Sequence, residues 1–273
     1  MRFFIALFVV GTFFSFSLPA EAVGMLEGKK QQSQAETRDL LVPHKALYDI
    51  SLVATRSGSQ IINISGQMFY EWKPTCDAWI TDHRFNLFYE YADSPGMKIT
   101  SDFSTFETFD GENFNFSARR KRDDSIYQEF RGRAVVENEG GEAVYNIPDD
   151  LNFDLDKNAM FPMTHTVEMI RTAKENKKFF QAVVFDGSDD EGPVSINTFI
   201  GTPANAMQVL EPSENIDMSL LNTPAWNVRM AVFPVLNEEE SSDYEMSMIF
   251  HENGVISDMS IDYDDFSVAQ KLV

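Results

Sequence analysis

Polar and apolar residues alternate with a period of two along much of this chain, and such alternation predicts β-strands. In residues 62–70, for example, Ile62, Ile64, Met68 and Tyr70 share one face. The same alternation recurs in residues 85–91, 114–118, 126–136, 194–200, 228–232, 244–250 and 255–263. Pro-Gly, Asp-Gly, Gly-Gly and Asn-Gly pairs lie between these segments and are typical turn signals. The pattern therefore predicts about a dozen strands that are linked mainly as hairpins.

A single stretch, residues 161–178, follows a helical period instead. Met163, Val167, Ile170 and Ala173 fall on one stripe, and Thr164 is the expected N-cap behind Pro162. A strand over residues 179–185 is expected to follow, and it ends at an Asp-Gly turn signal. The stripe predicts one short amphipathic helix that plugs or covers the inner face of a curved sheet.

These elements predict an all-β, mainly antiparallel fold. A meander this long has to curl or close to protect its edge strands, so a barrel, a spiral or a strongly rolled sheet is expected. The apolar fraction of 43%, with 24 phenylalanines, supplies a large core, and no change of composition marks a second domain. Residues 41–273 are therefore predicted to form a single domain.

The N-terminus carries the pattern of a secretory signal peptide. A cationic start at Arg2, an apolar run and small residues at Ala20 and Ala22 predict cleavage after Ala22, so that residues 1–22 are removed. The alternative is an uncleaved membrane anchor, for which the apolar run is short. Residues 23–40 are polar and are predicted to be a flexible leader.

Composition and motifs argue against several kinds of chemistry. The net charge of −21 argues against nucleic-acid binding. The four histidines lack a partner at metal-ligand spacing, and no nucleophile motif is present, so no metal, cofactor or catalytic residue is predicted. His165 is interpreted as a hydrogen-bonded structural residue. The acidic run at 186–192 lacks the spacing of a calcium-binding loop and is expected to be solvated.

One cluster of positive charge stands out in this acidic chain. It consists of Arg119, Arg120, Lys121, Arg122, Arg131 and Arg133, which face one another across a predicted hairpin. Two interpretations are open. The cluster is either a site for an anionic partner or a charged edge that discourages association between sheets.

A series of short motifs extends over about residues 41–266. It includes residues 43–48 (PHKALY), 66–70 (GQMFY), 76–79 (CDAW), 161–162 (FP), 165–166 (HT), 185–188 (FDGS) and 252–254 (ENG). Their order and spacing resemble the cell envelope integrity EipB family of periplasmic proteins of alphaproteobacteria. The motif residues are His44, Tyr48, Gly66, Cys76, Asp77, Trp79, Phe161, Pro162, His165, Asp186, Gly187, Trp226, Asn253 and Gly254.

The resemblance implies an open, spiral-like barrel that is exported to the periplasm, supports envelope integrity and has no enzymatic activity. In one respect the chain departs from the family. Members of the family resemble it at Cys76 but form a disulfide with a second cysteine near the C-terminus, whereas Cys76 is the only cysteine here. No intramolecular disulfide is therefore expected, and Cys76 is predicted to be a mostly buried, unreactive thiol.

Two functions follow as hypotheses. The first is a non-enzymatic periplasmic protein that binds other envelope proteins or the cell wall through its rolled sheet and edges. The alternative is a periplasmic carrier that holds a lipid or another apolar ligand within the roll.

Overall fold

The computed structural model describes residues 37–204, 215–236 and 241–273. The predicted signal peptide (1–22) and residues 23–36 of the predicted leader lie outside these ranges. The described end of the leader contacts the folded domain. Leu40 packs against the core, and the hydroxyl of Thr37 accepts a hydrogen bond from Arg171 (3.2 Å).

Within the described residues, the strands form a single 14-stranded sheet, and every neighbouring pair is antiparallel. The strands are β1 (His44–Thr55), β2 (Ile61–Pro74), β3 (Ala78–Tyr91), β4 (Met97–Thr108), β5 (Asn113–Arg122), β6 (Ser125–Glu137), β7 (Gly140–Ile147), β8 (Asn152–Leu155), β9 (Phe179–Val184), β10 (Val194–Ala204), β11 (Ala225–Pro234), β12 (Tyr244–His251), β13 (Ile256–Asp262) and β14 (Phe266–Leu272). The all-β, antiparallel prediction is confirmed.

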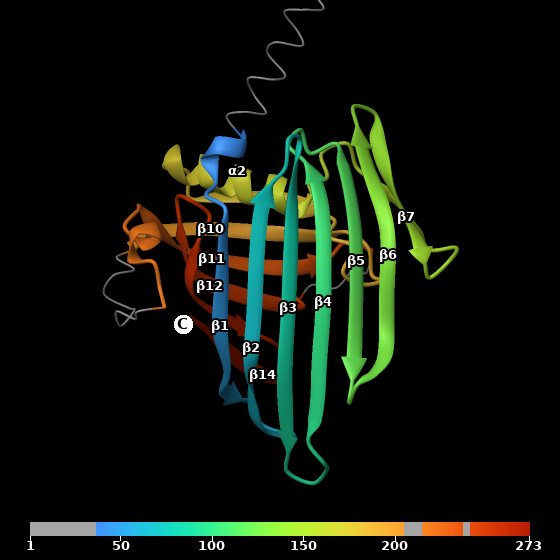
Figure 1. The fold of residues 1–273 in the computed structure, drawn as a ribbon, viewed down its shortest axis with the longest axis vertical. Helices are drawn as coiled ribbons and strands as arrows, with labels where there is room; N and C mark the ends of the chain where they lie inside the picture. The colour runs from blue at the N-terminus through green and yellow to red at the C-terminus, as the bar shows by residue number, and fades with distance from the viewer. Residues whose placement is uncertain (1–36, 205–214, 237–240) are drawn as a thin grey trace, which may run out of the picture.

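The strand order shows two meanders that meet in the middle of the sheet. One runs from β1 to β8 and the other from β9 to β14, and β1 pairs with β14. In Figure 1 the long strands β1–β7 form the near wall, and β10–β12 run across behind them. The sheet is thus rolled up but open, because its two edge strands, β8 and β9, do not pair with each other. This geometry confirms the open, spiral-like barrel.

The connection between the two ends protects one of them. After β8 the chain passes beside β9, where the Met160 N–H donates to the Val183 carbonyl (2.8 Å) and the Phe185 N–H donates to the Met160 carbonyl (3.0 Å). These bonds occupy backbone groups that a free edge would expose to pairing with another chain. The opposite end, β8, is only four residues long, which also limits pairing.

The predicted helix is α2 (Pro162–Lys174), and it lies at one end of the roll between the two walls (Figure 1). Met163, Val167, Ile170 and Ala173 are all buried, as the stripe predicted. The predicted N-cap at Thr164 is wrong. The cap position is occupied by Phe161, which makes no side-chain cap hydrogen bond, because Pro162 already starts the helix. A short 3₁₀ helix, η2 (Met218–Leu221), is also present.

Two clusters of buried side chains hold the roll together. The main core lies between the inner faces of β1–β3 and β9–β14 and includes the apolar stripe of α2. The second, which we call the phenylalanine cluster, lies inside β5–β8 and contains Phe114, Phe116, Phe130, Phe161 and Phe185. Burial of this apolar surface is the main force that keeps the sheet curved around α2.

Candidate functional site

Several motif residues gather at one end of the main core. Trp72 and Trp79 are buried and in edge contact, with ring centroids 5.0 Å apart. The Trp72 indole N–H donates to a ring nitrogen of His44 (2.7 Å). The Tyr48 hydroxyl donates to the Ile256 carbonyl (2.7 Å), which ties β1 to β13. These contacts give His44, Tyr48 and Trp79 structural roles in the core.

The Asn253-Gly254 turn joins three parts of the chain. The Asn253 amide donates to the Leu220 carbonyl in η2 (2.7 Å), and the Asn253 carbonyl accepts from the Val42 N–H (3.0 Å) just before β1. Gly254 has φ +90°, and a β-carbon there would lie 2.9 Å from Leu41. The turn therefore requires glycine for both its backbone conformation and its packing. Trp226 on β11 packs against the same main core.

Gly66 allows a close approach between β2 and β3. A β-carbon at this position would lie 2.1 Å from the Asn86 carbonyl oxygen and 2.9 Å from Leu87. Both neighbours belong to β3, which is the hydrogen-bonded partner of β2. A glycine is therefore needed here so that the long strands can stay paired.

A buried carboxyl group caps the N-terminus of α2, and the sequence did not predict it. Glu107 on β4 is 1% exposed, and its carboxylate accepts hydrogen bonds from the N–H groups of Met163 (2.7 Å) and Thr164 (2.6 Å). It also accepts from the Thr164 hydroxyl (2.6 Å). Burial raises the pKa of Glu107 to about 7, and the bonds from Thr164 and Met163 act in the opposite direction. Glu107 satisfies the helix N-terminus in place of a local cap.

The phenylalanine cluster contains the second group of motif residues. Phe161 stacks on Phe114 with ring centroids 4.9 Å apart. Gly187 has φ +67°, and a β-carbon there would lie 2.4 Å from the ring of Phe116. The prediction that the acidic run is solvated is wrong for Asp186. Asp186 is half-buried because the turn folds back toward the cluster, and burial raises the pKa of its carboxyl.

Cys76 and Asp77 lie in the turn between β2 and β3. Cys76 is exposed, so the prediction of a mostly buried thiol is wrong. The reason is that the turn directs only Ala78 and Trp79 inward, while residues 75–77 face solvent. The Asp77 carbonyl accepts a hydrogen bond from the Phe109 N–H (3.0 Å), so its backbone connects β3 to the end of β4.

The exposure of Cys76 gives a direct prediction. In the folded protein under non-reducing conditions, we expect a thiol reagent to label Cys76 at nearly the rate seen after denaturation. Mass spectrometry of labelled protein over time measures both rates. Slow labelling of the native form, with about one equivalent bound after unfolding, would contradict the exposed position.

His165 lies within α2. Its ring is buried and packs against Phe180 with centroids 5.2 Å apart, but its Nε2 has no hydrogen-bond partner among the described residues. The interpretation of His165 as a hydrogen-bonded residue is therefore wrong for this nitrogen. Burial lowers the pKa of His165 to about 4, so the ring is neutral near pH 7.

The structure divides the predicted basic cluster between two faces. β5 and β6 form the expected hairpin, and alternation along them directs Arg119, Lys121, Arg131 and Arg133 to the outer face. On this face Arg119 forms an ion pair with Glu129 (2.8 Å). Arg120 and Arg122 instead line a cavity of the roll, where Arg120 is half-buried and Arg122 remains exposed to solvent. The cluster is thus two sets of cations separated by the sheet.

The space that Arg120 and Arg122 face is the inner cavity, with a volume of about 570 Å³. It opens between the inner faces of β1–β5 and those of β13 and β14. Its apolar walls include Met68, Phe85, Leu87, Tyr89, Ile261 and Phe266. His83 and Gln270 also line the cavity. Burial lowers the pKa of His83 to about 4.

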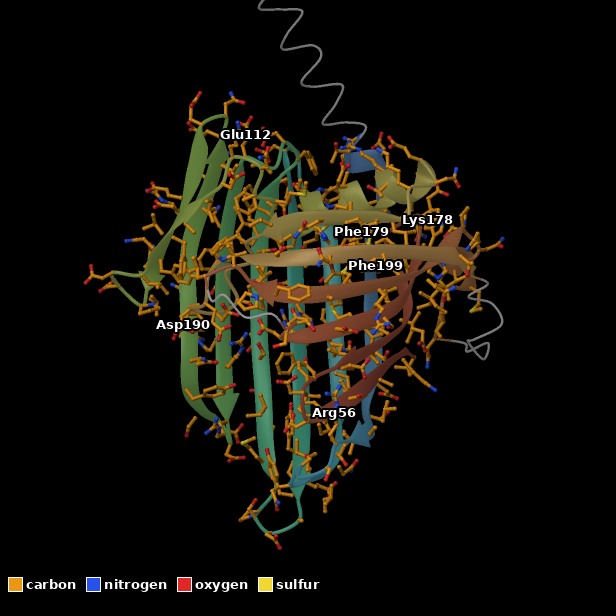
Figure 2. The ribbon with its side chains drawn as sticks, turned by 180° about the vertical axis from the view of Figure 1, so that it is seen from behind. Arg56, Glu112, Lys178, Phe179, Asp190 and Phe199 are labelled. Atoms are coloured by element: carbon orange, nitrogen blue, oxygen red, sulfur yellow. The ribbon has the colours of Figure 1, made fainter. Side chains whose placement is uncertain are left out.

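The opposite side of the sheet carries an exposed pair of aromatic rings. Phe179 on β9 and Phe199 on β10 are cross-strand partners that are 48% and 50% exposed, with ring centroids 4.9 Å apart. Figure 2 shows them beside each other on the outer surface, with Lys178 next to them at the start of β9. We call these three residues the outer aromatic patch. A shallow groove of about 400 Å³ begins at Phe199 and continues past Asn227.

Among residues 37–204, 215–236 and 241–273, no group of three or more histidine, cysteine, aspartate or glutamate side chains is placed to hold a metal ion. In the same part of the chain, no helix combines the length and the apolar character needed to cross a membrane.

The fold and its sites define a class of open, barrel-like β-proteins in which most motif residues support the core and its turns. The EipB-like family model matches residues 35–273, and the chain belongs to this family. It is 30% identical over 256 residues to the cell envelope integrity protein EipB of Brucella abortus (strain 2308), covering 92% of this chain and 89% of the relative. The resemblance drawn from the motifs is confirmed.

A solved structure supports the same relationship. The crystal structure of a beta-barrel-like protein with a domain of unknown function from Brucella abortus is 28% identical, with a TM-score of 0.77. The match covers 85% of this chain and 96% of that one. Together, the relatives support a role of this chain in cell envelope integrity.

Proposed function

We propose that this chain is a non-enzymatic periplasmic protein that supports envelope integrity by binding another envelope protein through the outer aromatic patch. The observation that carries the proposal is the half-exposed pair Phe179 and Phe199, whose rings are in contact on the outer surface. Exposed aromatic rings with a polar rim are typical of the centre of a protein interface. Lys178 and Asn227 provide polar groups around the rings.

The non-enzymatic part of the proposal rests on the surroundings of the titratable side chains. His83 and His165 each have a ring nitrogen without a hydrogen-bond partner among the described residues, so neither is paired there with a nucleophile. His251 contacts the hydroxyls of Ser257 (3.0 Å) and Thr223 (3.3 Å), but it is fully buried, so no substrate reaches it. A His165→Ala variant that stayed folded but lost a measurable reaction would favour an enzyme instead.

Export is the first requirement of this function. Cleavage of the signal peptide is expected after Ala22, because small residues stand at the positions that signal peptidase reads. N-terminal sequencing of the protein from a periplasmic fraction should therefore begin at or close to Val23. Recovery of a chain that starts at Met1 in the membrane fraction would contradict it.

The proposed interface is tested with a double variant, Phe179→Ser with Phe199→Ser. Both side chains are half exposed, so the fold should tolerate the change while the apolar contact is lost. In a strain from which the gene is deleted, we expect the wild-type chain to restore resistance to detergent and the double variant to fail. Crosslinking in the envelope, followed by affinity purification, should give a protein adduct with the wild type alone.

A matched control comes from another strand. Phe88 on β3 is also exposed, at 45%, and Phe88→Ser removes one exposed aromatic ring of the same kind away from the patch. This variant should keep both the adduct and the detergent resistance. The proposal is wrong if Phe88→Ser and the double variant behave alike, or if the wild type is recovered with cell-wall fragments and no protein.

A further inference from the structure

We propose that the inner cavity binds a single-chain anionic amphiphile, with its acidic head at Arg120 and Arg122 and its chain along the apolar wall. This inference concerns a site on the opposite side of the sheet from the outer aromatic patch. It is therefore independent of the proposed protein partner.

The walls of the cavity have the character of a lipid-chain site. Aromatic and aliphatic side chains from β2, β3, β13 and β14 face one another across it, among them Phe85, Leu87 and Phe266. Pockets that hold small molecules have volumes of about 300–1,000 Å³ and are mostly apolar with a few polar groups. The inner cavity, at about 570 Å³, has the size for one ligand with one chain.

The two arginines supply the charge that selects an anion. Arg120 donates to the neutral side chain of Gln128 (3.0 Å), and the guanidinium of Arg122 lies 4.9 Å from the ring centre of Tyr127. Neither forms an ion pair with a carboxylate in the described part of the chain, unlike Arg119 on the outer face. A guanidinium has five N–H donors, so both retain donors for a carboxylate or phosphate head.

The interior also offers two polar atoms that lack partners. Gln270 is 6% exposed, and its Oε1 has no hydrogen-bond partner among the described residues; the same is true of His83 Nε2. A buried polar atom without a partner costs free energy, which a ligand recovers by bonding to it. Both side chains line the cavity, where an ester or hydroxyl group near the head of an amphiphile would meet them.

Titration of the full mature chain with dansyl-undecanoic acid tests the site. We expect saturable binding with an increase in fluorescence, and displacement of the probe by an anionic competitor. Oleate and lysophosphatidic acid, used in separate titrations, distinguish a carboxylate head from a phosphate head. Oleyl alcohol has the same chain as oleate without the charge, and it should compete at least about tenfold less well because it lacks charge-assisted hydrogen bonds.

Paired variants locate the head and the chain. The double variant Arg120→Gln with Arg122→Gln should weaken probe binding at least about tenfold. Arg131→Gln with Arg133→Gln changes the net charge equally on the outer face and should stay within about twofold of wild type, since neither residue lines the cavity and surface charges outside it contribute little. Leu87→Trp keeps both arginines but fills the cavity, and it should abolish binding.

Three results would overturn the proposal. They are an absence of saturable binding to the folded wild type, an equal loss of affinity in the two arginine pairs, and displacement by oleyl alcohol as effective as by oleate. Circular dichroism of each variant establishes that the fold is retained. Leu87→Trp keeps the site testable if the inner arginine pair fails to fold, because it changes no charge.

Discussion

Replacing Glu107 by alanine is expected to lower the free energy of unfolding by about 3–5 kcal/mol, because buried donors that lose their acceptor cost about 1–3 kcal/mol each. Three donors, the N–H groups of Met163 and Thr164 and the Thr164 hydroxyl, end on this carboxylate. No side chain at the cap position replaces it, since Phe161 has no polar group. At pH values above the Glu107 pKa of about 7, the loss also removes a negative charge from the helix N-terminus. Urea denaturation followed by circular dichroism measures the change.

Two further variants define the cause. Asp102 lies on the same strand, β4, but on its exposed face. Asp102→Ala should change the free energy of unfolding by less than about 0.5 kcal/mol. Glu107→Gln keeps the size of the side chain and one acceptor oxygen, but its amide N–H groups face the helix donors. Its effect should therefore lie between those of the other two. If Glu107→Ala lowers the free energy of unfolding by less than about 1 kcal/mol, water caps the helix in place of the carboxylate.

The second large effect is acid destabilisation by buried histidines. Burial lowers the pKa of His83, His165 and His251 to about 4, and that of His44 also lies below its ordinary value. A group that is neutral when buried but protonates in the unfolded chain stabilises the fold above its unfolded pKa of about 6.5. That stability is lost as the pH falls from about 6.5 to 4, by up to about 3 kcal/mol for each fully shifted histidine.

Two carboxyl groups act with the opposite sign. The pKa of Glu107 is raised to about 7 and that of Asp186 is raised as well, so their folded forms hold a proton that the unfolded chain has released. Their contribution to stability is present at low pH and is lost as the pH rises through the pKa of the folded state. Since more histidines than buried carboxyls are shifted in the described core, we expect a net loss of stability on acidification.

The variant His165→Leu isolates one histidine. Leucine fills a similar volume and removes both the titrating ring and its unpaired Nε2. Stability near pH 7 should change little, but the loss between pH 6.5 and 4 should be smaller than in the wild type by up to about 3 kcal/mol. Urea midpoints at several pH values measure the slope. Identical slopes in the two proteins would mean that His165 does not titrate with folding.

Local sequence patterns were sufficient to predict the strands and the apolar stripe of α2. Alternation in residues 62–70 and 85–91 predicts strands because side chains on a strand point to opposite faces, and that relationship needs no tertiary information. The same holds for Met163, Val167 and Ile170, whose spacing places them on one side of a helix. The order of the motifs was likewise sufficient to identify the family.

Contacts between distant segments decided the rest. Glu107 and Met163 are 56 residues apart, so nothing local to the helix revealed its cap, and Thr164 was assigned that role instead. The last strand, β14, pairs with β1 in the middle of the sheet, although the end of a chain suggests an edge. Strand pairing of this kind depends on which sheet faces can be buried together, and only the rolled arrangement of the whole chain determines that.

The basic cluster shows most clearly which features follow from local sequence and which depend on the fold of the whole chain. The run of basic residues was enough to predict six cations on one hairpin, and β5 and β6 form it. The fold of the whole chain was needed to show that Arg120 and Arg122 line the inner cavity while Arg131 and Arg133 lie on the outer face. Alternation places neighbouring side chains on opposite faces, but which face becomes the inside is set by the direction in which the sheet rolls around its apolar core.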